Sequence, residues 1–278
     1  MWVCVIGFQV AAGWNGLYSA GQMAPLSIGS QTGGSIIRPA SYCGVVGYKP
    51  SYGLISRNGV LKTSEKLDTI GVFGKSVEAV ALLAKALMKK DLYDPATIHF
   101  AADEIVEATQ KEPHFEPKFI FYKTDKWKNI DKESKNAFEF FLKKFKKNIE
   151  VFDVPGYFKD IPKHHQIIHE TDLANNFQAY YKKDKKKLSK EIRDAIERGL
   201  KYSAYDYANA IDFMEQSYQS YKEVFEDYHG VITPSASGVA EKGLKSTGSA
   251  DFQKIWTYMG LPTISLPLLT GESDLPLG

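Results

Sequence analysis

Cysteine is scarce in this chain, and a long uninterrupted apolar run is missing. The 278 residues contain two cysteines, Cys4 and Cys43, too few for a disulfide framework. This favours a reducing, cytoplasmic location. Residues 1–23 are apolar but broken by four glycines, and they lack the basic start of a signal peptide. They therefore predict a buried strand or helix, and no membrane partner.

A strong excess of charge of either sign is also missing. Lys and Arg number 35 against 33 Asp and Glu, for a formal net charge of +2. Lysines crowd at 143–147 and 182–187, in a region where Asp and Glu are interspersed. That mixture is typical of solvated helical faces and argues against a nucleic-acid partner.

The patterns that are present predict a single α/β domain over residues 1–278. Apolar runs at 118–124 and 149–154 flank a helical pattern at 131–147, which predicts a crossover between parallel strands. Residues 71–91 predict a strand and then a helix capped by Ser76.

Three further segments complete this expectation. The small and apolar residues of 41–48 predict a buried strand, and 230–240 predict a strand that runs into a loop. Residues 252–259 predict a short amphipathic helix with a strand after it. Residues 156–229 predict a helical region, with breaks near Asp184 and Gly199.

The most informative stretch is Pro25 to Pro50, which contains SQTGGS. Gly33 and Gly34 can adopt backbone angles closed to other residues, so a loop there can turn several N–H groups toward one point. Ser35 at the end of such a turn is a candidate nucleophile, because those N–H groups stabilise an oxyanion. The simpler interpretation is an ordinary strand-to-helix turn rich in small residues.

The longer run GSQTGGSIIRPASYCGVVGYKPSYG, followed by LDTIGVFGKSVEAV, resembles the signature region of the amidase signature family. The resemblance returns near the end of the chain at VITPSASG and FQKIWTYMGLPTISLP. It implies an α/β fold with a mixed central β-sheet covered by helices on both faces. It also implies amide hydrolysis by a Ser, cis-Ser, Lys triad without a cofactor, and a small-molecule amide as substrate.

The resemblance implies roles for particular residues. Ser35 would form the acyl-enzyme, and the backbone N–H groups of Thr32, Gly33 and Gly34 would line the oxyanion hole. Gln31, next to this loop, is expected to contact the substrate.

Arg38 and Asp68 have more open assignments. The Arg38 guanidinium is a candidate ligand for a substrate carboxylate, because it matches two oxygens at once. A salt bridge or a clamp on a loop is the alternative, and both stay open. Asp68 lies in the element LDT, where a structural role is expected.

The other two triad members have no match in the sequence. The segment that carries the cis-Ser aligns near residues 11–13, where no serine stands, and the lysine aligns before Met1. The expectation is therefore a chain incomplete at both termini. Lys49, Lys62 and Lys75 are disfavoured as replacement bases.

Two alternatives to an amidase follow. One is a catalytically impaired relative that acts by binding only. The other is an amidotransferase A-type subunit, ranked lower because those subunits more often read GGSIRxP where this chain has GGSIIRP. The oligomeric state is undecided, and a homodimer is kept as an option.

A histidine cluster invites a metal interpretation. His165 and His169 lie one helical turn apart, and His164 is adjacent. No third ligand completes a recognisable metal motif, so no metal is predicted.

Overall fold

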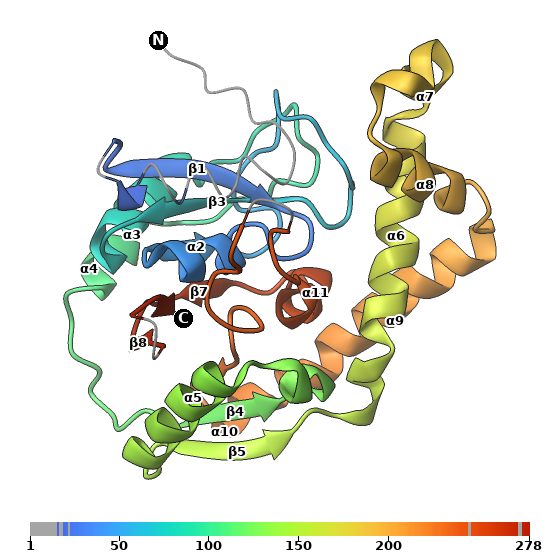
Figure 1. Cartoon of the computed structure of the whole chain (residues 1–278). Helices are drawn as coiled ribbons and strands as arrows, with labels where there is room; N and C mark the ends of the chain where they lie inside the picture. Colours follow the sequence, from blue (N-terminus) through green and yellow to red (C-terminus); the bar gives the residue numbers. More distant parts are fainter. Residues whose placement is uncertain (1–15, 17–18, 22, 244–245, 272–273) are drawn as a thin grey trace.

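The computed structural model describes residues 16, 19–21, 23–243, 246–271 and 274–278. Two β-sheets form the body of the molecule, and a group of long helices stands at one side of them (Figure 1). The predicted α/β class is confirmed. Strands of both directions occur, but in the described residues they belong to separate sheets.

The first sheet is antiparallel and carries the signature stretch. Its strand order is β1-β3-β2-β7. The strands are β1 (Leu26–Gln31), β2 (Val46–Lys49), β3 (Thr69–Gly74) and β7 (Thr263–Ser265). Helix α3 (Val77–Leu87) follows β3, and Ser76 Oγ accepts from the Ala79 amide at its start, as the sequence predicts. Val72 of β3 and Val80 of α3 share one buried cluster on this face.

The opposite face lies against helix α2 (Ile37–Cys43). A Cβ atom at Gly47 would stand 2.4 Å from Ala40 Cβ, and one at Gly71 would stand 2.7 Å from Ile36 Cδ1. A Cβ atom at Gly71 would also stand 2.3 Å from the Tyr48 carbonyl oxygen of β2, so no side chain fits at either position. At Gly47 the obstacle is α2 itself, which therefore approaches the sheet closely. Helices thus cover both faces of the sheet.

The strand predicted over 41–48 is wrong in its first half. Residues Ser41 to Cys43 form the last turn of α2, and the strand begins at Val46. Gly44 ends the helix with φ 64°, a left-handed conformation that glycine adopts without penalty. Small and apolar residues fit a buried helix as well as a strand, which is why the pattern misled.

The second sheet is parallel, with the order β5-β4-β6. Its strands are β4 (Phe119–Lys123), β5 (Ile149–Asp153) and β6 (Gly230–Ile232), and α5 (Lys132–Lys144) joins the first two. The predicted crossover is confirmed. Phe138 of α5 packs on Phe121 of β4, with ring centroids 6.0 Å apart.

The region predicted to be helical is helical, and the two predicted breaks, at Asp184 and Gly199, are present. Further breaks at Phe177 and Glu223 were not predicted. It contains η2 (Gly156–Lys159), α6 (Ile161–Asn176), α7 (Gln178–Asp184), η3 (Lys185–Lys187), α8 (Lys190–Gly199), α9 (Ala204–Lys222) and α10 (Val224–Asp227). The remaining elements are α4 (Ile105–Ala108), η1 (Asp125–Asn129), α11 (Asp251–Tyr258), β8 (Leu269–Thr270) and β9 (Pro276–Leu277). None of the helices in the described part of the chain has both the length and the apolar character that crossing a bilayer requires.

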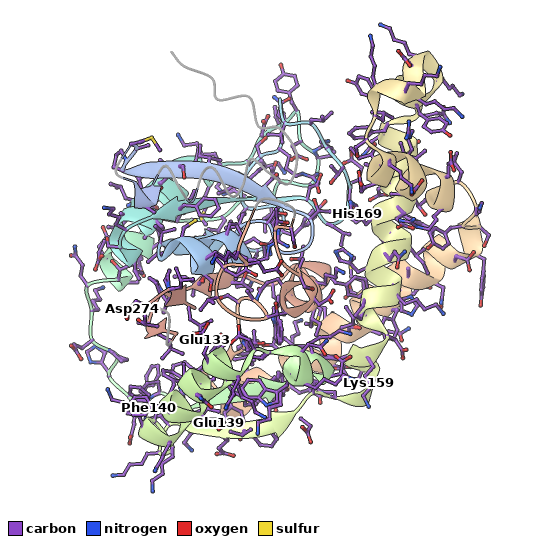
Figure 2. All side chains as sticks on the ribbon, in the orientation of Figure 1. Glu133, Glu139, Phe140, Lys159, His169 and Asp274 are labelled. Atoms are coloured by element: carbon purple, nitrogen blue, oxygen red, sulfur yellow. The ribbon has the colours of Figure 1, made fainter. Side chains whose placement is uncertain are left out.

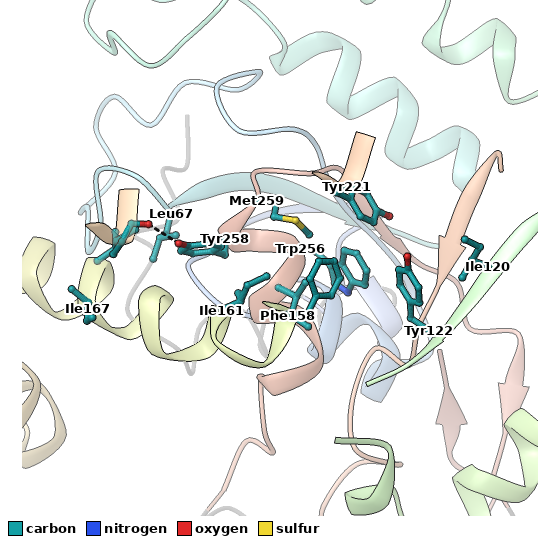
Figure 3. Packing of buried hydrophobic residues seen from close by; sticks show 13 residues of the cluster. Leu67, Ile120, Tyr122, Phe158, Ile161, Ile167, Tyr221, Trp256, Tyr258 and Met259 are labelled. Carbon is teal, nitrogen blue, oxygen red and sulfur yellow. Dashed lines mark hydrogen bonds between the residues drawn. The ribbon is translucent and has the colours of Figure 1, made fainter. Parts of the chain in front are cut away.

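An aromatic cluster joins the second sheet to α11 and to the long helices (Figure 3). Trp256 of α11 stacks on Tyr122 of β4, with ring centroids 6.5 Å apart and planes 7° apart. Tyr258 is fully buried, and its hydroxyl donates to the Ala210 carbonyl of α9. These contacts fix α11 from one side, and its other side meets the signature loop.

Candidate active site

The backbone of the loop after β1 is held by side chains from two distant helices. His165 Nε2 lies 2.7 Å from the Thr32 carbonyl oxygen, and Thr257 Oγ1 donates to the Gly33 carbonyl at 2.7 Å. A trans peptide carries its C=O and N–H on opposite sides. Because both carbonyls point toward α6 and α11, the N–H groups of Gly33 and Gly34 point away from these helices.

The hydrogen-bonding groups on the other side of the loop are free. Within residues 23–243 and the other described segments, the amides of Gly33 and Gly34 donate to no acceptor. The Ser35 side chain is half-buried, and its hydroxyl has no hydrogen-bond partner in the same part of the chain. The loop therefore presents unpaired N–H groups next to an accessible hydroxyl.

Gln31 supports the loop from below. Its side chain is fully buried, and its Oε1 accepts from the amides of Ile36 at 2.8 Å and Ile37 at 3.0 Å. Its Nε2 donates to Thr257 Oγ1 at 2.9 Å. These bonds cap the start of α2 and use both ends of the Gln31 side-chain amide. The expected contact of Gln31 with substrate stays a prediction.

Arg38 clamps a second loop onto α2. It is 5% exposed, and its Nη1 donates to the Gly248 carbonyl at 2.9 Å and its Nη2 to Thr247 Oγ1 at 3.3 Å. Burial lowers the pKa of Arg38, and the nearby Tyr42 and Glu241 partly offset that effect. The contacts match the clamp interpretation, and a role in binding a carboxylate stays untested.

Asp68 anchors the loop through the side chain of Thr32. Its carboxylate accepts from Thr32 Oγ1 at 2.5 Å, from Thr63 through both its amide and its hydroxyl, and from the Ser64 amide. It is 6% exposed. These contacts agree with the structural role expected for this residue.

One face of α11 and the residue before it forms the wall behind the loop. This face consists of Ala250, Gln253, Lys254 and Thr257. A Cβ atom at Gly34 would stand 3.1 Å from Ala250 Cβ and 3.2 Å from Gln253 Cβ. The apolar pattern of 252–259 predicts this helix but not the contacts of these four residues with the loop. Their spacing of i, i+3, i+4 and i+7 was the available signal.

The histidine cluster is placed at the same loop. His165 is 3% exposed, and burial, with a smaller effect of the neighbouring His169, lowers its pKa to about 3. His169 lies on the side of α6 that faces the first sheet (Figure 2). No group of three or more His, Cys, Asp or Glu side chains in the described ranges is arranged to hold a metal ion. Sequence spacing gave no signal for the contact of His165 with Thr32.

The three lysines considered as replacement bases lie in environments that do not suit that role. Lys49 is fully buried, donates to the carbonyls of Leu261 at 2.6 Å and Pro50 at 3.0 Å, and has its pKa lowered to about 7 by burial. Lys62 pairs with Glu65 at 3.3 Å, and Lys75 is exposed. None of them hydrogen-bonds to Ser35 in the described part of the chain. The segment aligned with the cis-Ser, residues 11–13, lies outside the described residues.

A groove of about 560 Å³ lies elsewhere in the molecule, between β4, the end of β5 and helices α9 and α10. Its walls include Tyr122, Asp153, Tyr157 and Glu223, and none of its lining residues belongs to the signature loop. The candidate site is therefore defined by hydrogen bonding at the loop and not by this groove.

The family follows from comparison with known proteins. A family model described as Amidase matches residues 15–278. This chain belongs to the Amidase family. The membership agrees with the signature resemblance and places Ser35 in the stretch that the family model covers.

Individual relatives of this chain share less than a third of its residues. The A-type subunit of the glutamyl-tRNA(Gln) amidotransferase of Sulfurihydrogenibium sp. is 28% identical, over an alignment that covers 96% of this chain and 62% of the relative. The solved structure of the corresponding protein from Thermotoga maritima is 27% identical, with a TM-score of 0.76, over 96% of this chain and 60% of the other. The chain thus spans about three fifths of the length of the relatives it matches.

A further solved structure shares the fold at lower identity. It is a vestigial protein complex that reveals the evolutionary origins of an s-triazine catabolic enzyme. It has a TM-score of 0.84 at 22% identity, over 96% of this chain and 61% of that chain. At this identity, the likeness supports the fold alone.

Proposed function

We propose that this chain carries the nucleophile and the oxyanion hole of an amidase that hydrolyses a carboxylic amide through an acyl-enzyme on Ser35. The observation that carries the proposal is the locked loop. The carbonyls of Thr32 and Gly33 are bound to His165 and Thr257, and the amides of Gly33 and Gly34 are left free beside the Ser35 hydroxyl in the described part of the chain. Such fixed N–H groups stabilise negative charge without reorganising during the reaction.

The reaction proceeds in two steps. In the first, Ser35 Oγ bonds to the amide carbonyl carbon, its proton passes to a base and then to the leaving nitrogen, and the C–N bond breaks. An amine or ammonia leaves, and an ester on Ser35 remains. In the second, water attacks the ester, frees the acid and restores the hydroxyl. The free amides of Gly33 and Gly34 hold the oxyanion of both tetrahedral intermediates.

The base that accepts the Ser35 proton is not assigned to any described residue. No side chain in the described segments hydrogen-bonds to the Ser35 hydroxyl. The nearby His165 is unsuited, because its Nε2 is bound to Thr32 and burial lowers its pKa to about 3. The proposal therefore concerns the nucleophile and the groups that stabilise the oxyanion.

The test is covalent labelling of Ser35 in the full chain. A fluorophosphonate probe should add to wild-type protein by displacement of fluoride, and peptide mapping should place the adduct on Ser35. Hydrolysis of a panel of aliphatic and aromatic amides should fall by at least ~10³-fold in Ser35→Ala. Ser76→Ala, which removes only the cap of α3, should cost about 1 kcal/mol of stability and retain labelling. Turnover that persists in Ser35→Ala would contradict the proposal.

The second candidate function is that of an A-type subunit of an amidotransferase. It is favoured by relatives of 26–28% identity that are A-type subunits of glutamyl-tRNA(Gln) amidotransferases. Glutaminase activity that appears only with partner subunits would support it. A chain that binds amides but leaves Ser35 unlabelled would support the binding-only alternative.

A further inference from the structure

The contact between His165 and the signature loop joins residues 133 positions apart. His165 lies on α6, in the helical region, and its ring reaches the Thr32 carbonyl at 2.7 Å. A carbonyl oxygen only accepts, so Nε2 carries the proton in this hydrogen bond. The ring is 3% exposed and stands 6.0 Å from the His169 ring, between α6 and the loop.

Helix α6 is itself held in place, so His165 reaches the loop from a fixed position. Asp172, two turns after His165, accepts from Ser64 Oγ at 2.5 Å and from Tyr207 of α9 at 2.8 Å. Ser64 in turn donates its amide to Asp68, which binds the Thr32 hydroxyl. The Thr32 residue is therefore fixed at its side chain through Asp68 and at its carbonyl through His165.

This double attachment sets the orientation of the Thr32–Gly33 peptide. The side-chain bond fixes where Thr32 lies, but rotation of the peptide plane would still redirect the Gly33 N–H. The bond from His165 to the carbonyl removes that freedom, because the C=O and N–H of one peptide turn together. A catalytic N–H must be aimed to within a fraction of an ångström.

We propose that His165 is a positioning residue for the oxyanion hole, and that its Nε2–H holds the Thr32–Gly33 peptide so that the Gly33 N–H faces the reacting carbonyl. This inference rests on the proposed function of Ser35. It gives the helical region a part in transition-state stabilisation that acts through the Thr32–Gly33 peptide. It also accounts for a buried imidazole that is neither exposed to substrate nor part of a metal group in the described residues.

Three variants separate positioning from packing. His165→Leu removes the donor and keeps much of the volume, whereas His165→Gln retains an N–H donor at the position of Nε2. His164→Leu is the control, because His164 is 9% exposed, stacks on Phe213 at 4.3 Å and lies beside His165 without contacting the loop. All three are compared with wild type for folding by circular dichroism and chemical unfolding.

The readouts are kcat, KM and hydrogen exchange at the amides of Ile36 and Ile37, which donate to Gln31 inside the same loop. We expect His165→Leu to lower kcat by roughly 10- to 100-fold, with KM changed by less than about threefold. Its exchange at these amides should accelerate. The kcat of His165→Gln should lie within about fivefold of the wild-type value. His164→Leu should keep the wild-type kcat, and exchange at these two amides should stay as slow as in wild type.

Two results would overturn the inference: equal loss of kcat in His165→Leu and His164→Leu, or unchanged exchange at Ile36 and Ile37 in a folded His165→Leu. Failure of the proposed function is recognised separately, because wild-type Ser35 would then resist the fluorophosphonate. The exchange measurement needs no activity and still decides whether His165 holds the loop.

Discussion

Gln31 and Thr257, 226 positions apart, share a hydrogen bond of 2.9 Å directly beneath the signature loop. The Thr257 hydroxyl accepts from the Gln31 amide and donates to the Gly33 carbonyl. One hydroxyl thus links β1, the loop and α11. The loop geometry depends on residues that lie far from the signature in sequence.

Thr257→Val should weaken both stability and catalysis. Valine keeps the shape but leaves the Gln31 amide and the Gly33 carbonyl without this partner, at a cost of roughly 2–4 kcal/mol. We expect kcat to fall about tenfold, because the Gly33–Gly34 peptide is released. Chemical unfolding and amide turnover measure the two effects. The matched control is Thr263→Val, since the buried Thr263 hydroxyl has no partner among the described residues; an equal loss in this control would contradict the explanation.

Arg38→Ala should behave as the loss of a clamp. The bonds to Gly248 and Thr247 disappear, and the loop before α11 loosens, so we expect the free energy of unfolding to fall by about 2–3 kcal/mol. KM should change alike for a neutral amide and for a matched amide that carries a carboxylate. A rise of KM confined to the carboxylate substrate would instead make Arg38 its ligand.

Asp68→Asn should destabilise the chain by about 2–3 kcal/mol. Asn replaces one acceptor oxygen with a donor, although Asp68 accepts from two backbone amides and two hydroxyls. Thermal or urea unfolding would show the change. Glu112→Gln, at an exposed position, should stay within about 0.5 kcal/mol of wild type; a neutral Asp68→Asn would mean that the network contributes little.

The buried His165 should make stability fall in acid. Its pKa is about 3 in the folded chain against an ordinary value of 6.5, so between these values the unfolded state binds more protons. The free energy of unfolding therefore drops as pH falls through this window, by roughly 2 kcal/mol between pH 6.5 and 5. His169, Lys254 and Asp251 also act on the ring. Urea unfolding of His165→Gln should show a smaller drop than wild type, and an identical drop would refute the assignment.

Much of the framework is encoded locally and could be predicted. The cap at Ser76, the crossover from β4 to β5 and the breaks at Asp184 and Gly199 each follow from a few adjacent residues. The place of Ser35 in a strand-to-helix turn was likewise expected, and the structure has it between β1 and α2.

The support of the site was not predictable in the same way. The contacts of His165 and Thr257 join segments more than 100 positions apart, and neither residue type marks such a contact in sequence. Arg38 left two interpretations open because a guanidinium binds carbonyls and carboxylates with the same N–H groups. The contacts of Arg38 with residues 247–248 favour the clamp, and carboxylate binding stays a prediction.

The missing side chains at Gly47 and Gly71 affect how the turn that contains Ser35 is held. At these two positions the strands carry no side chain, so Ala40 and Ile36 pack directly on the strand backbone. Around them, Ile36, Ile37, Ala40, Val45 and Phe73 form one tightly packed buried cluster. A displacement of β2 or β3 would therefore also move the turn before α2, so the sheet helps to set the position of the Ser35 hydroxyl.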